Sequence, residues 1–493
     1  MSAVPAPPVS AATERSDLGE IGASIADPLP VLRSTPDFVG MPNGDRPLAD
    51  ESRFAAAQAA AGGWLLVAVA STLLLGGAGL AALVTWPYAV ALFAVFVWLP
   101  AYLSVFRYAA LFFEDPPGLT VVRPVTPVTV VVSGNAAPGP TRSALAYLAA
   151  QDYDGPLRVV MVGGGLSDDD VRATQQTAFG LGINLDILRG GWLGPAAACN
   201  LALPHVATPL VLTLQAGTCL HPSAVRLLVA RLESSPRETA GVSGHAFVRN
   251  RRSGLVAEVL AAGSTRDVDT TRRVESLFQG AQVAEPACMV FHVQALRALN
   301  GLPDDPASAV AASWRFLERG WRVGYEPHAL AFTTQPVTIG TAGRSRADAE
   351  RRVAAEAHET GVDPQRSTAS RFLGAVARSA LARDVAFTLA GLQALALLAR
   401  GNAALLVGYL LFVVPIALVT GALARRNQRE VLDETGLSTP RRLTDQVAPL
   451  LGLQAVQGPA AIAESLRGRP PRRRRSPRAL TRRRLARRGP RYA

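Results

Sequence analysis

The residues of this 493-residue chain best placed to do chemistry follow an apolar, β-branched run at 158–162. Three glycines, Gly163, Gly164 and Gly165, end the run, and Ser167 to Asp170 come shortly after them. Successive backbone N–H groups in a glycine turn can form a concave nest that binds an anion such as a phosphate. The same glycines can equally fill a tight turn in a core. Both interpretations stand at this point.

The carboxylates of the central region occur in three short groups, and each group has a structural interpretation. Asp168 to Asp170 is typical of a helix start, where negative charge suits the helix dipole. Asp267-Val268-Asp269 has a metal-binding spacing, but it lies in a polar stretch with no apolar strand before it, which predicts a solvated loop. Asp304-Asp305 is typical of a turn. The six histidines show no spacing typical of metal ligands.

Alternating strands and helices must position these residues. The sequence predicts strands at 128–132, 158–162, 183–188, 209–214, 286–293 and 322–325, and helices at 143–150, 171–179 and 195–203. This alternation favours an open α/β domain with a mostly parallel sheet. Ligands bind such sheets at the carboxyl ends of the strands. The glycines and Gln215-Ala216-Gly217, which follows the fourth strand, are therefore expected at one edge.

Apolar stretches on both sides of this domain predict membrane helices. The mean hydropathy is +0.20, and uncharged or nearly uncharged runs occupy 62–84, 86–106, 384–399 and 403–423. A helix needs about 20 apolar residues to cross a bilayer, and the run at 384–399 is the shortest of the four. Arg53 and Arg107 flank the first pair, which predicts cytoplasmic termini by the positive-inside rule.

The two ends of the chain are expected to be disordered tails. Residues 425–493 contain 18 arginines and 5 acidic residues, so this tail holds the excess behind the formal charge of +12. Beside a membrane span, anionic lipid headgroups are favoured over nucleic acid as its partner. The expected organisation has six segments: an N-terminal tail (1–60), a transmembrane hairpin (61–107), the α/β domain (120–343), charged and interfacial amphipathic helices (344–383), a second hairpin (384–424) and the Arg-rich tail (425–493).

With these residues in view, the chain resembles the membrane-bound family 2 glycosyltransferases, which include the synthases of cellulose, hyaluronan and poly-N-acetylglucosamine. The resemblance covers roughly residues 61 to 423 and rests on the order of its segments. These read VTVVVSGNAAPGPTRSALAYLAAQDYDGPLRVVMV, WLGPAAACNLAL, PLVLTLQAGTCLHPSAV, ALRALNGLPDD and WRFLERGWRVGYEPHALAF. It implies a GT-A domain between two pairs of transmembrane helices, and sugar transfer from a nucleotide donor with Mg²⁺ or Mn²⁺.

The charged residues of that family are missing from their expected places. Gly163 and Gly164 replace a pair of aspartates, although Gly165 and Asp168 still follow the pattern. Pro195 stands for a lysine, and Gln215-Ala216-Gly217 for the metal-binding Asp-x-Asp. The Glu-Asp pair that supplies the base falls at Ser308-Ala309, and Gln-x-x-Arg-Trp falls at residues 345–349, which read SRADA.

The sequence therefore favours a catalytically degenerate subunit in the synthesis or export of an envelope glycan. Such a protein would lie in the inner membrane, with no catalytic or metal-binding residue of its own and a membrane glycan-synthesis protein as partner. Gly163, Gly164, Gly165, Asp168, Gln215 and Gly217 would line a vestigial nucleotide-sugar cleft. Two alternatives remain open: an active atypical transferase with a nucleotide- or lipid-linked donor, and a membrane scaffold with a basic tail.

Overall fold

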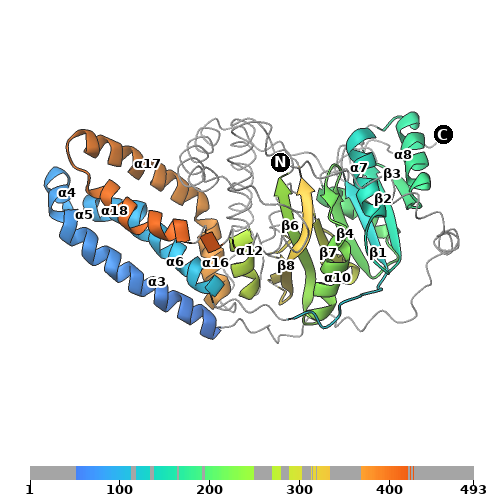
Figure 1. The fold of residues 1–493 in the computed structure, drawn as a ribbon, viewed down its shortest axis with the longest axis horizontal. Helices are drawn as coiled ribbons and strands as arrows, with labels where there is room; N and C mark the ends of the chain where they lie inside the picture. The colour runs from blue at the N-terminus through green and yellow to red at the C-terminus, as the bar shows by residue number, and fades with distance from the viewer. Residues whose placement is uncertain are drawn as a thin grey trace, which may run out of the picture.

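In the computed structural model, the described residues are 51–112, 118–133, 138–163, 166–190, 195–248, 269–278, 288–302, 312–313, 315–317, 319–333, 368–419, 422–423 and 426. They form a sheet with helices packed on it and, beside it, a group of long apolar helices (Figure 1). Several predictions concern residues outside these ranges. They are residues 1–50 of the N-terminal tail, the C-terminal tail apart from Arg426, and the segment at 344–367. The single residues outside the ranges are Gly164, Gly165, Asp267, Asp304, Asp305 and Ser308.

The sheet has eight strands in the order β3-β2-β1-β4-β7-β6-β8-β5. Its central strand β1 is buried along its whole length, which explains its uninterrupted apolar sequence. The strand bounds are β1 Val128–Ser133, β2 Leu157–Gly163, β3 Asn184–Arg189, β4 Leu210–Gln215, β5 Cys219–Leu220, β6 Thr239–Val248, β7 Cys288–His292 and β8 Arg322–Thr333.

Half of the sheet agrees with the expected parallel arrangement, and the other half corrects it. β1 pairs in parallel with β2 and β4, and β2 pairs in parallel with β3. In the second half β7 runs antiparallel to both β4 and β6, while β8 is parallel to β6 and antiparallel to β5. The sheet is therefore mixed rather than mostly parallel, and the sequence analysis missed β5 and β6 entirely.

Helices pack on both faces of the sheet and enclose two apolar cores. One core contains Val160, Ala198, Leu296 and Trp321, and the other contains Val159, Leu145 and Leu228. The helices of this domain are α7 Pro138–Ala149, α8 Asp168–Gly180, α9 Pro195–Ala202, α10 Ala224–Ser234, α12 Asp269–Leu277 and α13 Val293–Ala298.

Three described helices are long and apolar enough to cross a membrane: Ser52–Thr72, Trp86–Phe112 and Ala382–Ala399. A fourth apolar helix, Ala404–Val419, lies within the span expected at 403–423. The elements are α3 Glu51–Thr72, a π-helical turn η2 Leu73–Gly77, α4 Ala78–Leu83, α5 Trp86–Phe93, a second π-helical turn η3 Ala94–Trp98, α6 Leu99–Phe112, α16 Thr368–Arg378, α17 Ala380–Ala399 and α18 Ala404–Phe412.

The first helix already includes Glu51, ten residues before the hairpin boundary expected at residue 61. Phe54, Ala57 and Ala61 recur at helical spacing and are all buried. This part of the helix therefore packs its apolar face inside the protein.

Helix α12 lies between the sheet and the apolar helices (Figure 1). On one side, Phe278 at its carboxyl end packs against Phe54 and Phe106 in a buried aromatic cluster. Phe372 of α16 packs edge-on against the same two rings. This cluster joins four segments that are far apart in the sequence, and it fixes the sheet domain to the apolar helices.

We expect Phe54→Ala to lower the free energy of unfolding of the full chain by about 3–5 kcal/mol, because the buried ring leaves a cavity among three other aromatic rings. Thermal or chemical unfolding in detergent measures this loss. Phe179→Ala is the matched control, since the Phe179 side chain on α8 is 89% exposed. Equal destabilisation by the two substitutions would contradict this role for the cluster.

Candidate functional site

The carboxyl ends of four neighbouring strands meet at one edge of the sheet. Ser133, the last residue of β1, lies in register with Val162 of β2 and with Gln215 of β4. Gly163, one residue further along β2, lies opposite Arg189 of β3. The structure thus places Gly163 and Gln215 on either side of β1, while Gly164 and Gly165 lie outside the described residues.

Backbone hydrogen bonds tie the loops at this edge to the neighbouring strands. Ala216 N donates to Ser133 O at 2.7 Å, and Gly190 N donates to Gly163 O at 3.0 Å. Each bond continues the ladder one residue past the strand that precedes the loop. The loops therefore leave the sheet from fixed positions, which are set by backbone pairing rather than by side chains.

The turn at Gln215-Ala216-Gly217 contains a backbone conformation that favours glycine. Gly217 has φ +89°, in the left-handed region, and Thr218 N donates to Gln215 O at 2.9 Å to close the turn. A side chain at position 217 would add strain, because L residues other than glycine rarely adopt such a φ. The side chain of Gln215 is exposed at the edge and offers a neutral amide.

The three aspartates after the glycines are held by the start of α8, as the capping interpretation predicted. Ser167 and Asp170 form a capping box: Ser167 Oγ accepts from Asp170 N at 3.1 Å, and the Asp170 carboxylate accepts from Ser167 N at 3.1 Å. Ser167 Oγ also donates to the Asp170 carboxylate at 2.6 Å, and this hydrogen bond, together with that from Ser167 N, lowers the pKa of Asp170. Asp169 pairs with Arg172 at 2.7 Å one turn along the helix, and Asp168 pairs with Arg189.

Arg189 is the residue that the sequence analysis missed. It ends β3 beside Gly163, and its guanidinium forms an ion pair across to Asp168 at the first turn of α8. Of the four strand-end residues Ser133, Gly163, Arg189 and Gln215, it alone carries a charge. Its sequence signal was weak, because an arginine at the end of a strand is common and its partner lies in a segment already assigned to capping.

The residues described at this edge do not fit a divalent cation. Mg²⁺ and Mn²⁺ prefer carboxylate oxygens, whereas Gln215 offers one neutral carbonyl and the buried Ser133 hydroxyl donates to Leu214 O at 3.3 Å. Within the described part of the chain, no three His, Cys, Asp or Glu side chains gather closely enough to hold a metal. Asp269 is the first residue of α12, a helix that packs on β8 and α6 away from this edge.

A glycine-dependent contact joins α9 to the segment after α13. Asn200 of α9 forms two hydrogen bonds with the backbone of Leu302, one from Leu302 N at 2.7 Å and one to Leu302 O at 2.6 Å. Gly301 has φ +94°, and a Cβ at this position would lie 2.3 Å from Asn200 Oδ1. The contact between α9 and the segment after α13 therefore requires glycine at position 301.

A buried polar cluster lies where β6 and β8 meet α12. His245 Nδ1 and Tyr325 OH share a hydrogen bond at 2.6 Å. The Arg272 guanidinium of α12 lies 5.9 Å from the centre of the Tyr325 ring and donates to Gly244 O at 3.3 Å. His245 is thus a hydrogen-bonded core residue, and Arg272 helps to fix α12 to the sheet.

Comparisons with known proteins bear on this arrangement. No family model matches the chain. An N-acetylglucosaminyltransferase from Neorhizobium galegae is 23% identical over 237 residues, which cover 46% of this chain and 53% of that protein. The chain therefore spans about half the length of this curated relative.

Among solved structures, the mannosyltransferase PcManGT from Pyrobaculum calidifontis, in complex with GDP-Man and Mn²⁺, matches with a TM-score of 0.54 and 18% identity. The match covers 82% of this chain and 99% of that one. This chain has a glycosyltransferase-like fold. S. aureus TarS 1-349 in complex with UDP covers 70% of this chain and 91% of that one at 14% identity, but its TM-score of 0.35 is too low to support a conclusion.

In this glycosyltransferase-like domain, a buried ion pair on β8 gives the stability a dependence on pH. Glu326 is 1% exposed and bonds to Arg231 at 2.7 Å and to His328 Nδ1 at 2.9 Å. Burial raises the pKa of Glu326, but the hydrogen bonds from His328 and the charge of Arg231 outweigh it, so its pKa lies below the ordinary value. Its stabilising contribution is complete above the ordinary glutamate pKa and is lost as the pH falls through the lowered one.

We expect Glu326→Gln to lower the free energy of unfolding by about 3–5 kcal/mol at neutral pH, because Arg231 keeps a half-buried charge without its partner. Melting curves between pH 7 and pH 3 should show the variant approaching the wild type as the wild type loses this ion pair. Asp169→Asn, at an exposed pair, is the control and should change stability by less than about 1 kcal/mol. A constant difference across the pH range would exclude Glu326 as its source.

Proposed function

We propose that this protein is a membrane-bound, family 2-like pseudo-glycosyltransferase with a GT-A domain, acting as a subunit in the synthesis or export of an envelope glycan. One observation carries the proposal. Gly163 and Gln215 end strands on either side of β1, and these positions and Gly217 correspond in sequence to aspartates of the resembled family's donor site.

The chemistry of sugar transfer explains why these replacements matter. A diphosphate leaving group develops negative charge that a divalent cation or fixed positive groups must stabilise. The acceptor hydroxyl also needs a base within hydrogen-bond reach to take its proton. Gln215 can supply neither function, and Ser308, at the family's base position, is a poor base.

Binding can survive where catalysis is lost. Arg189 is a cation at the edge, opposite Gly163 of β2. Charge-assisted hydrogen bonds from a guanidinium suit the oxygens of a diphosphate. The protein would then hold a nucleotide or nucleotide sugar as a structural or regulatory ligand, with no metal. In the unliganded protein Asp168 neutralises Arg189.

The apolar helices support a place in a membrane. With the soluble domain and both termini in the cytoplasm, the Arg-rich tail would lie against anionic lipid headgroups of the inner membrane. An active synthase or another membrane assembly protein would be the partner, and a pseudo-enzyme domain would serve to bind or regulate it. The substrate of the relative from N. galegae suggests an N-acetylglucosamine-containing glycan.

An active atypical transferase is the second candidate, and one contact favours it. Asp168 is an exposed carboxylate beside the edge, paired with Arg189, and it could act as a base if a lipid-linked donor needed less help from a metal. Asp304 is the other carboxylate that this candidate could use. If Asp168→Asn and Asp304→Asn both left sugar transfer unchanged, this candidate would have no base.

The pseudo-enzyme proposal predicts an absence of turnover. Purified full-length protein in detergent, supplied with the common UDP- and GDP-sugars and Mg²⁺ or Mn²⁺, should release no nucleotide above the no-protein background. A mass-spectrometric assay for transferred sugar checks the same point. Robust transfer that Gln215→Ala abolishes would overturn the proposal.

The proposed nucleotide site makes a separate prediction about Arg189. We expect Arg189→Ala to weaken the binding of UDP or GDP roughly tenfold, the factor for losing one hydrogen bond to a charged group. Asp168→Asn should act in the opposite direction, because it releases the Arg189 charge. Equilibrium binding with a fluorescent nucleotide measures both changes.

Arg172→Ala is the matched control, since Arg172 also pairs with an aspartate on the first turn of α8 but lies further along the helix. It should leave nucleotide affinity unchanged. If Arg172→Ala and Arg189→Ala weaken binding equally, general charge rather than position explains the effect, and the assignment of Arg189 fails.

A further inference from the structure

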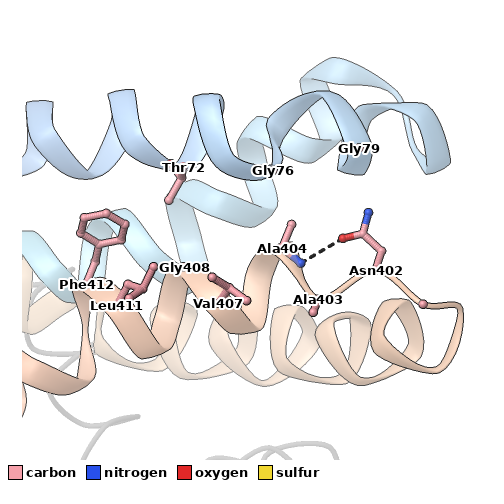
Figure 2. Close-up of a pocket in the computed structure, with 11 residues that line it drawn as sticks. Thr72, Gly76, Gly79, Asn402, Ala403, Ala404, Val407, Gly408, Leu411 and Phe412 are labelled. Carbon is pink, nitrogen blue, oxygen red and sulfur yellow. Dashed lines mark hydrogen bonds between the residues drawn. The ribbon is translucent and has the colours of Figure 1, made fainter.

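A cavity of about 300 Å³ lies between the two apolar hairpins, at the end farthest from the sheet (Figures 1 and 2). Thr72, Gly76 and Gly79 line it from the first hairpin, and Val407, Leu411 and Phe412 line it from the second. It is remote from the strand-end edge, so it has no part in the function proposed above.

The two hairpins pack closely against each other beside this cavity. A Cβ on Gly76 would lie 2.6 Å from the Cβ of Ala404, and a Cβ on Gly408 would lie 3.2 Å from Val97. At these two points the glycine backbone therefore lies directly against a side chain of the other hairpin, Ala404 and Val97 respectively. Beside the contact with Ala404, the first helix widens into the π-helical turn Leu73–Gly77, a distortion that often accompanies functional sites.

One end of the cavity is polar. Asn402 Oδ1 accepts from Ala404 N at 2.9 Å, and its Nδ2 lies on the side of Gly79, 3.8 Å from where a Cβ of that glycine would be (Figure 2). Within the described part of the chain, Nδ2 has no hydrogen-bond partner. Two residues away, the exposed Arg400 is the single charged side chain in residues 73–99 and 385–419.

Aromatic side chains mark the same end as a membrane interface. Trp86 and Tyr88 begin the second helix of the first hairpin, and their side chains are 51% and 43% exposed. Exposed tryptophan and tyrosine collect at the level of lipid headgroups. Arg400 and the Asn402 amide would therefore lie at headgroup level, and the apolar walls of the cavity would extend towards the acyl chains.

We propose that this cavity, which forms a groove between the hairpins, binds one anionic phospholipid. An acyl chain would lie along Val407, Leu411 and Phe412, and the phosphate would lie beside Asn402 and Arg400. The polarity of the groove changes along its length in the same order as that of a lipid. The positive charge of Arg400 has no acidic counterpart in residues 73–99 and 385–419, and it matches an anionic headgroup.

The shape of the groove favours a lipid chain over a partner helix. A helix with its side chains is about 10 Å wide, and the two hairpins that line the groove touch at Gly76 and Gly408. A single alkyl chain is much thinner and can enter between the two hairpins. The groove thus fits a lipid without moving the glycine contacts that define it.

Photo-crosslinking tests the proposal on the full-length protein. The protein is reconstituted into nanodiscs of phosphatidylcholine that contain a small fraction of phosphatidylglycerol with a diazirine in one acyl chain. After illumination, peptide mapping should find the label on the segments around Gly76 and Val407. The matching phosphatidylcholine probe should label them about fivefold less, the factor for one cation next to an anionic surface.

Three variants separate a bound lipid from bulk lipid. Val407→Trp fills the groove and should abolish the preference, whereas Leu410→Trp, at a 53% exposed position outside the lining, should keep it. Asn402→Asp retains the oxygen that caps Ala404 but repels the phosphate, and it should also abolish the preference. Because it keeps the cap, it serves as the test if Val407→Trp does not fold.

Each other result would overturn the proposal. Equal labelling by the two lipids, or labelling that neither Val407→Trp nor Asn402→Asp changes, would show only the lipid that surrounds any membrane helix. Crosslinks between two copies of the chain in place of lipid adducts would assign the groove to a helix–helix contact.

Discussion

The parallel pairing of β1 with both β2 and β4 is the constraint on which the rest of the domain depends. Because β1 is buried along its whole length, a shift of one residue would exchange the side chains that pack into the two cores on its opposite faces. The register is therefore fixed, and it brings Ser133, Gly163 and Gln215 to one edge whatever their side chains are. In the proposed pseudo-glycosyltransferase, this is how a donor-site framework would persist after the loss of its carboxylates.

A second contact fixes this domain relative to the apolar helices. Helix α12 presents Phe278 to the aromatic cluster with Phe54 and Phe106, and it presents Arg272 to β6 and β8. The apolar cluster contributes most to stability, while the buried Arg272 and Tyr325 specify orientation, because polar groups in a core must meet particular partners. The edge of the sheet is thereby held at a fixed place relative to the helices that would lie in the membrane.

The sequence predicted the elements whose patterns are local, and it failed where close packing or distant contacts decide the structure. β1 to β4 were predicted to within a residue or two, because each is a run of apolar or β-branched residues between turns. β6 was missed because its glycines interrupt that pattern: a Cβ on Gly241 would lie 2.6 Å from Val290 O, so the strand needs a glycine where the sequence suggests a loop.

The same distinction applies to the site. Gly163 and Gln215 could be placed from sequence because topology alone brings strand ends together. Arg189 could not, since its importance comes from Gly163 on the neighbouring strand β2 and from Asp168 at the start of α8. The cluster of His245, Tyr325 and Arg272 likewise depends on contacts between distant segments, and the burial of Phe54 on the first helix depends on its packing against Phe278.

The central claim is that this edge binds a nucleoside diphosphate through Arg189 and backbone groups, without a metal. Isothermal titration calorimetry of UDP and GDP against the full-length protein, once with Mn²⁺ and once with a chelator, tests it most directly. The claim predicts the same dissociation constant under both conditions. Binding that Mn²⁺ strengthens tenfold or more would contradict it, because it would require carboxylate ligands at an edge that presents Gly163, Gln215 and Gly217 in their place.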